Sequence, residues 1–181
     1  MNVLAFAASN SSTSINKALV RHACDVLSSL NPEVKIDLID LNDFEMPIYS
    51  MDREKASGIP DLAKQFLTKI EQADALLISY AEHNGLYTVA YKNIFDWASR
   101  LGRDVFKNKP MVIMSASPGK GGGANVLKVA KEAAPHFSGQ VLASFSVGPF
   151  GEKFDETQNK LIDIELAKTL EQALGQLLKT K

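Results

Sequence analysis

Short apolar runs alternate with longer stretches of helical periodicity along the whole chain. The first run, Val3 to Ala8, is continuous, as expected for a strand buried on both faces. From Ile15 to Leu30 the apolar residues recur at helical spacing, which predicts a helix with one buried stripe. The same alternation predicts four more strands, at 34–41, 75–80, 111–116 and 141–147, and four more helices, at 59–73, 89–101, up to 134 and up to about 179.

A strand followed by a helix, repeated five times, predicts a doubly wound, five-stranded parallel sheet with helices on both faces. The segments 47–60 and 154–163 carry no such periodicity, and we expect a long charged loop and a lead into the last helix. The length of 181 residues suits one domain over residues 1–181. Because ligands of such sheets lie at the carboxyl ends of strands, the loops after the first, third and fourth strands are the candidate sites.

The loop after the first strand is rich in hydroxyl and amide groups and precedes a helix N-terminus. Free backbone N–H groups and the helix dipole attract an anion at such a place. The loop has no glycine and no Gly-Lys-Ser/Thr, so it is neither a dinucleotide fingerprint nor a Walker loop. A serine-rich helix cap is the alternative, but the position after a buried strand favours phosphate binding. The candidate phosphate ligands are Ser9, Ser11, Ser14, Ile15 and Asn16.

The loop after the third strand contains Asn84-Gly85, a turn signal that tolerates positive φ. Such a turn presents backbone donors and acceptors at the strand end, where they match the edge of a flat heterocycle. His83 has no second histidine or carboxylate at metal-ligand spacing, so we predict no metal site, and a loop residue without chemistry is its simplest interpretation.

The loop after the fourth strand has four glycines in the five positions 119–123. Glycine lets a backbone approach a ligand closely, and four of them are entropically costly in a mere connection. We therefore favour ligand binding over a flexible connection here.

At this point two segments resemble the signature of the NADPH-dependent FMN reductase family: Ala81-Glu82-His83-Asn84-Gly85-x-Tyr87 and Lys92-Asn93-x-x-Asp96-Trp97. That family usually reads Pro-Glu-Tyr-Asn-Gly-x-Tyr and Leu-Lys-Asn-x-x-Asp-Trp at the same spacing. Three further stretches are similar to family segments: Pro47-Ile48-Tyr49, Ser117-Pro118-Gly119 and Phe154-Asp155-Glu156. The family's first loop carries an arginine where Ser11 stands here, and Ala81 and His83 replace its proline and tyrosine.

The resemblance implies a flavodoxin-like fold and an oxidoreductase that passes electrons from NADPH or NADH through bound FMN to a small acceptor, such as a flavin, quinone, azo compound or metal oxyanion. It implies no catalytic side chain, because the flavin carries the chemistry. The flavin ring would lie over the second and third loops, against Glu82, His83, Asn84, Gly85, Ser117, Pro118, Gly119 and Gly121. A homodimer or homotetramer is also implied.

Charge and cysteine content narrow the class of protein further. Lys plus Arg number 20 and Asp plus Glu 21, and this balance disfavours a nucleic-acid partner and a strongly acidic electron carrier. The single cysteine, Cys24, favours a reducing cytoplasm, and we expect no signal peptide and no membrane span. A flavodoxin-type electron carrier and a flavin-free binding module are the alternative functions.

Overall fold

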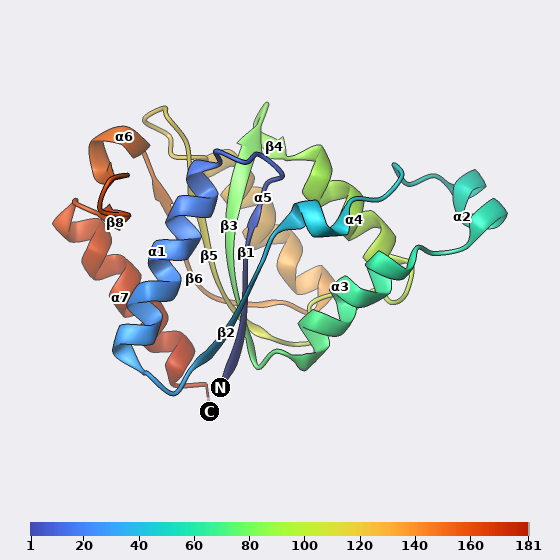
Figure 1. Cartoon of the computed structure of the whole chain (residues 1–181), viewed down its shortest axis with the longest axis horizontal. Coiled ribbons are helices and arrows are strands. Elements are labelled where there is room, and N and C mark those ends of the chain that lie inside the picture. Colours follow the sequence, from blue (N-terminus) through green and yellow to red (C-terminus); the bar gives the residue numbers. More distant parts are fainter. Residues whose placement is uncertain (181) are drawn as a thin grey trace.

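The computed structural model describes residues 1–180. The strands of its main sheet lie in the order β2-β1-β3-β5-β6, and all neighbouring pairs along this path are parallel. This is the strand order of flavodoxin-like doubly wound sheets, so the predicted fold class is confirmed (Figure 1). The five strands are Asn2–Ala8 (β1), Lys35–Ile39 (β2), Ala75–His83 (β3), Pro110–Ala116 (β5) and Gln140–Val147 (β6).

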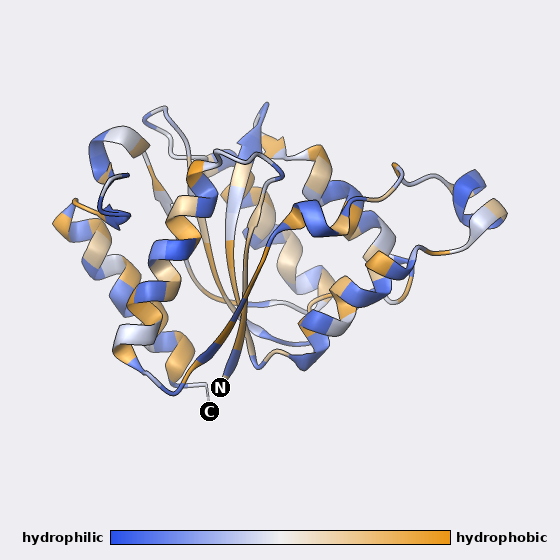
Figure 2. Cartoon of the chain, viewed as in Figure 1, coloured by the Kyte–Doolittle hydropathy of each residue, from blue (hydrophilic) through white to orange (hydrophobic). Residues whose placement is uncertain are grey.

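Helices cover both faces of the sheet (Figure 1). One face carries α1 (Ile15–Leu30) and α7 (Ile164–Leu178), and the other carries α3 (Asp61–Gln72), α4 (Val89–Ser99) and α5 (Ala124–Ala133). Successive strand residues point to opposite faces, so β1 sends Val3 to one apolar cluster and Leu4 to the other. Figure 2 shows the resulting hydrophobic stripes on helices α1 and α7.

The segment between β2 and β3 differs from the expected loop. The second strand ends at Ile39, and Leu41–Phe44 (η1) forms a 3₁₀ turn. The prediction of a loop over 47–60 was wrong, because Met51–Ser57 forms a helix, α2. The Ser50 hydroxyl caps this helix by accepting from the Arg53 N–H, and no residue of α2 is buried. A helix without a buried face leaves no apolar periodicity for a sequence to show.

Several short elements were also missed. Leu86–Tyr87 (β4) pairs antiparallel with the end of β3 and adds a sixth strand to the sheet. After α5 comes a 3₁₀ turn, Ala134–Phe137 (η2). The expected lead into the last helix contains a short helix and a hairpin: Phe150–Lys153 (α6), Phe154–Asp155 (β7) and Lys160–Leu161 (β8). Strands of two residues are too short to show a period of two, which explains why the pattern did not reveal them.

Candidate functional site

The three candidate loops meet at one edge of the sheet, because they follow three adjacent strands, β1, β3 and β5. Ala8 at the end of β1 pairs with Tyr80, and Ala81 pairs with Ala116 at the end of β5. The three strands therefore end at nearly the same level. The structure thus brings the predicted site residues of all three loops together.

Side chains tie the ends of these strands to one another. The Asn16 amide donates to the Ala116 carbonyl oxygen (3.0 Å) and accepts from the Ala116 N–H (2.9 Å) and the Ser79 hydroxyl (2.8 Å). The Thr88 hydroxyl donates to the Ala8 carbonyl oxygen at 2.9 Å. Asn16 is 2% exposed, so its side chain is fully used inside the protein. A contribution of Asn16 to an anion site would come from its backbone N–H.

The serine-rich loop leaves several of its donors free, although the Ser11 N–H donates to the Ser9 hydroxyl at 3.3 Å. The hydroxyl of Ser14, the residue before α1, makes no capping hydrogen bond. Among residues 1–180, the backbone N–H groups of Thr13, Ile15 and Asn16 have no hydrogen-bond acceptor. The first turn of a helix offers such N–H groups at the positive end of its dipole. The loop is therefore open to an external acceptor that carries negative charge.

The nearest cation of α1 is not available to that acceptor. Lys17 lies in the first turn, but its ammonium is 2.5 Å from the Asp40 carboxylate and the Lys17 side chain is only 13% exposed. Partial burial by itself raises the pKa of Asp40, but hydrogen bonds from the Asn42 N–H and from Lys17 outweigh it and lower that pKa. Asp40 is thus a stable anionic partner. An anion in the serine-rich loop would be held by neutral donors.

The glycine-rich loop is held in place by close backbone packing. A Cβ on Gly148 would lie 2.5 Å from the Gly119 oxygen, and one on Gly122 would lie 2.8 Å from the Val147 carbonyl carbon. The Ser115 hydroxyl donates to the Gly122 carbonyl oxygen at 2.8 Å. A Cβ on Gly121 would meet nothing within 4 Å. One side of the loop is therefore fixed against the protein, and the other is open.

The loop after β3 is a tight hairpin turn. Asn84 has φ 53° and Gly85 has φ 81°, and His83 pairs with Leu86 across the turn. Two central residues with positive φ are typical of the type I′ hairpin turn, which Asn-Gly favours. The expectation of a turn with positive φ is confirmed. The Glu82 carboxylate points back and accepts a hydrogen bond from the Val126 N–H at 2.9 Å.

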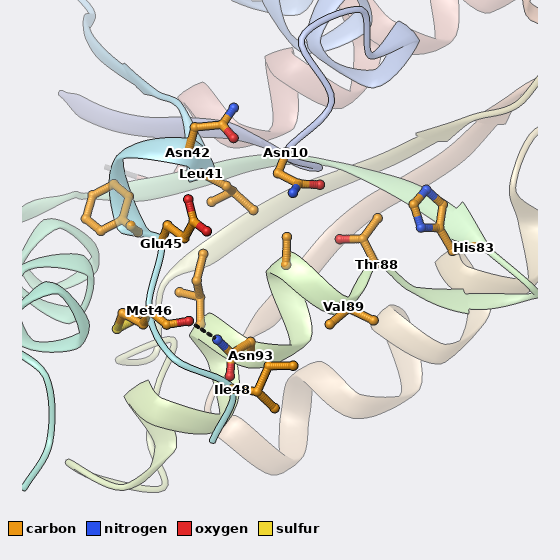
Figure 3. Close-up of a pocket in the computed structure, with 13 residues that line it drawn as sticks. Asn10, Leu41, Asn42, Glu45, Met46, Ile48, His83, Thr88, Val89 and Asn93 are labelled. Atoms are coloured by element: carbon orange, nitrogen blue, oxygen red, sulfur yellow. Dashed lines mark hydrogen bonds between the residues drawn. The ribbon is translucent and has the colours of Figure 1, made fainter. Parts of the chain in front are cut away.

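His83 faces a cavity of about 280 Å³ beside the serine-rich loop. Figure 3 shows Asn10 and His83 on one side of this cavity and Asn42, Glu45 and Met46 on the other. The segment 41–48 also lines this cavity, and the sequence did not predict this role. The predicted flavin ring and this cavity share His83, so the cavity lies next to the candidate cofactor site.

Hydrogen bonds hold the segment 46–49 against helix α4, and both of these parts of the chain carry family-like residues. The Asn93 amide donates to the Met46 carbonyl oxygen at 3.0 Å and accepts from the Tyr49 N–H at 2.8 Å. The Trp97 indole N–H donates to the Pro47 carbonyl oxygen at 2.8 Å. Trp97 is 1% exposed, so its side chain packs inside the protein. These residues position the wall of the cavity.

Three tyrosines beneath the site stay protonated near neutral pH. Burial raises the pKa of Tyr87 to about 12, and it raises the pKa of both Tyr80 and Tyr91. The ring centroids of Tyr80 and Tyr91 are 5.3 Å apart. Neutral phenols at this depth act as packing groups rather than as bases.

The donor set suits a flat cofactor that ends in a phosphate. The serine-rich loop supplies neutral donors with free N–H groups. The glycine-rich loop supplies backbone that no side chain shields, since a Cβ on Gly119 would meet only the Ser117 hydroxyl, at 3.9 Å. FMN fits both features. Residues 1–180 contain no cluster of potential metal ligands and no helix long and apolar enough to cross a membrane.

Sequence comparison finds similarity to FMN reductases and quinone oxidoreductases. Residues 1–152 match the family described as NADPH-dependent FMN reductase. A probable NADPH:quinone oxidoreductase of Oryza sativa subsp. japonica is 31% identical over 178 residues, which are 96% of this chain and 88% of that protein. An NAD(P)H-dependent FMN reductase of Pseudomonas aeruginosa is 35% identical over 124 residues, which are 68% of this chain and 64% of that protein.

A solved structure agrees at the level of the fold. The flavoenzyme NAD(P)H:(acceptor) oxidoreductase of Paracoccus denitrificans superimposes with a TM-score of 0.72 at 24% identity, and the match covers 98% of this chain and 94% of that one.

Proposed function

This chain belongs to the NADPH-dependent FMN reductase family, and from that membership we propose that it passes electrons from NADPH or NADH through bound FMN to a small acceptor. The names of its relatives favour a quinone among such acceptors. One structural observation carries the proposal: among the described residues, the N–H groups of Thr13, Ile15 and Asn16 have no acceptor, and a glycine-rich loop with an open outer side lies at the same sheet edge.

Each loop of this chain would hold a different part of the cofactor. The serine-rich loop, with Ser9, Ser11, Ser14 and the backbone of Ile15 and Asn16, would hold the phosphate. The turn 83–85 and the segment Ser117–Gly121 would hold the ring. When bound, FMN supplies the two-electron chemistry. Backbone N–H groups near Gly119 would stabilise negative charge on the reduced ring, because they are fixed in place before charge develops.

The absorbance spectrum of the purified protein, before and after anaerobic addition of NADPH, tests this function. We expect a flavin spectrum that bleaches with NADPH and recovers when a quinone is added. Released flavin should run as FMN on a column. Released FAD, or no uptake of added FMN, would contradict the proposal. Bound FMN that NADPH does not reduce would indicate an electron carrier of the flavodoxin type.

The working unit that we propose is a homodimer in the cytoplasm. The apolar residues of α4 do not support a dimer, because they are largely used within the chain. Trp97 is buried, and Phe95 contacts Phe137 at 4.7 Å between ring centroids. Helix α2 gives better support for the homodimer. Figure 1 shows α2 projecting from the body, and none of its residues is buried.

Helix α2 is nevertheless held at a defined place. The Glu54 carboxylate accepts from the Arg100 guanidinium at 2.9 Å and from the Tyr49 hydroxyl at 3.0 Å. The hydrogen bond from Arg100 lowers the pKa of Glu54. A projecting helix that is braced on its inner side and carries Met51 at 62% exposure suits contact with a second copy.

Light scattering at micromolar concentration tests the dimer. We expect twice the monomer mass for the wild type and a shift toward the monomer for Met51→Lys. Asp52→Lys, which adds a lysine next to the apolar contact, is the control. A monomeric wild type with full NADPH-driven activity would remove the dimer proposal without affecting the proposed chemistry.

A further inference from the structure

Helix α5 begins without a cap of its own. The residue before it, Gly123, has φ 79° and no side chain, and the first turn contains no acidic residue. The third N–H of the helix, that of Val126, instead donates to the Glu82 carboxylate at 2.9 Å. Val126 is fully buried, so this N–H would have no water to replace Glu82. A residue 44 positions earlier in the chain therefore caps α5.

Glu82 joins the two loops that would hold the flavin ring. It lies at the end of β3, pairs with Tyr87 of β4 and directly precedes the 83–85 turn. Helix α5 directly follows the glycine-rich loop, whose last residue is Gly123. The hydrogen bond from Val126 to Glu82 thus fixes the far end of the glycine-rich loop to the base of the turn.

The capping group also has an electrostatic effect. A carboxylate at a helix N-terminus compensates the positive end of the helix dipole. Within the described part of the chain Glu82 makes no ion pair, and its partner is the neutral N–H of Val126. Glu82 therefore adds negative charge to the sheet edge between the two ring-binding loops. Negative charge near a flavin disfavours the anionic reduced form relative to the oxidised form.

We infer that Glu82 is a positioning residue that fixes the glycine-rich loop against the 83–85 turn, and that its carboxylate lowers the reduction potential of the flavin held between them. The inference rests on the proposed function for the flavin, whereas the positioning role rests on the protein alone. Glu82 would act through Val126 and the loop, with no contact to the ring required.

Two variants of Glu82 separate charge from geometry. Glu82→Gln keeps an oxygen that accepts from the Val126 N–H but removes the charge, and Glu82→Ala removes both. Asp163 offers a matched control, because its carboxylate accepts from the Leu166 N–H, the third of helix α7, at 3.0 Å. Helix α7 lies on the opposite face of the sheet from α5. Asp163→Asn therefore removes the charge of a helix cap away from the two loops, and Asp163→Ala removes the cap as well. Both variants also break the ion pair of Asp163 with Lys153.

The midpoint potential of the bound flavin tests the electrostatic part. We expect Glu82→Gln to raise the affinity for reduced FMN relative to oxidised FMN by about tenfold, which is about 30 mV for a two-electron couple. Both Asp163 variants should leave the potential unchanged, although they lower the melting temperature. A Glu82→Gln protein with the wild-type potential would overturn this part, since it would reduce Glu82 to an ordinary helix cap.

Hydrogen exchange in the flavin-free protein tests the positioning part. We expect Glu82→Ala to accelerate exchange at the backbone amides of residues 119–127 at least tenfold, Glu82→Gln to change it little, and Asp163→Ala to affect α7 instead. Equal exchange at 119–127 in Glu82→Ala and Asp163→Ala would overturn the positioning role. If the wild type takes up no FMN, the proposed function and the effect on the potential fall together, and hydrogen exchange still decides the positioning role.

Discussion

The serine-rich and glycine-rich loops lie at the same edge of the sheet, but they are built in opposite ways. In the serine-rich loop, Ser14 makes no capping bond, and several N–H groups have no acceptor within residues 1–180. In the glycine-rich loop, Gly122 lies so close to Gly148, which follows β6, that neither residue has room for a Cβ. The first loop keeps donors for the phosphate that we propose it binds, whereas the second is packed against the protein. A ligand-binding role therefore does not require one kind of local structure.

The largest expected effect concerns the support beneath the serine-rich loop. Asn16→Ala removes three hydrogen bonds and leaves the buried groups of Ala116 and Ser79 without partners. Each unsatisfied buried group costs about 1–3 kcal/mol, so we expect a loss of about 4 kcal/mol in the free energy of unfolding. Urea denaturation measures it. A loss below about 1 kcal/mol would mean that the open loop does not depend on a fixed base.

The next largest loss of stability tests how rigidly the glycine-rich loop is held. Gly148→Ala places a Cβ 2.5 Å from two backbone atoms, the Gly119 oxygen and the Gly122 nitrogen. Backbone cannot move aside as a flexible side chain can, so we expect a loss of about 3 kcal/mol. For a chain of this size the melting temperature should fall by roughly 6–12 °C.

Gly121→Ala is the control for Gly148→Ala, because its Cβ would meet nothing within 4 Å. We expect its melting temperature to stay within about 2 °C of the wild type, in line with ordinary surface substitutions. Equal effects of the two substitutions would remove the distinction between the fixed side and the open side of the loop.

A smaller effect tests whether the serine-rich loop is completed by its ligand. Ser14→Ala should leave stability unchanged, since the hydroxyl caps nothing. It should weaken FMN binding by up to about tenfold, or about 1.4 kcal/mol. Fluorescence quenching on titration of FMN into the flavin-free protein measures the affinity.

Lys17→Ala is the contrasting variant for Ser14→Ala. Because the Lys17 ammonium is engaged by Asp40, we expect less than a twofold change in FMN affinity. A larger loss in Lys17→Ala than in Ser14→Ala would show that a cation, and not neutral donors, holds the phosphate.

The smallest effect lies outside both loops, under α1. Burial lowers the pKa of His22, although the negative charge of Asp25 acts in the opposite direction. The His22 ring meets the Phe154 ring edge-on, with 5.8 Å between the ring centroids. The unfolded chain then binds more protons than the folded one just below the ordinary histidine pKa of about 6.5. Stability should be full above that pH and fall as the pH drops through it. Melting temperatures at pH 8 and pH 5.5 measure the change.

His22→Gln should flatten this pH dependence, because it removes the titrating group. If the variant keeps the wild-type slope, the acid sensitivity comes from another titratable group.

The sequence was sufficient to predict the order of strands and helices along the chain and to identify the three loops. A continuous apolar run such as Val3–Ala8 and an amphipathic run such as Ile15–Leu30 are local patterns, and both occur where they were predicted. Asn84-Gly85 is likewise a local turn signal, and its positive φ values follow from those two residues alone. Helix α2 was missed because none of its residues is buried, so its sequence shows no apolar periodicity.

The sequence by itself therefore determined the alternation of strands and helices, the parallel sheet and the three loops at its edge, because burial periodicity and turn chemistry act between near neighbours. Only the tertiary structure decided which of the candidate side chains are free. Asn16 and Glu82 both carry polar groups suited to a ligand, but Ala116, 100 residues away, engages the first and Val126 engages the second. Their partners are distant along the chain, so no local pattern records the contact, and folding alone brings the groups within hydrogen-bonding distance.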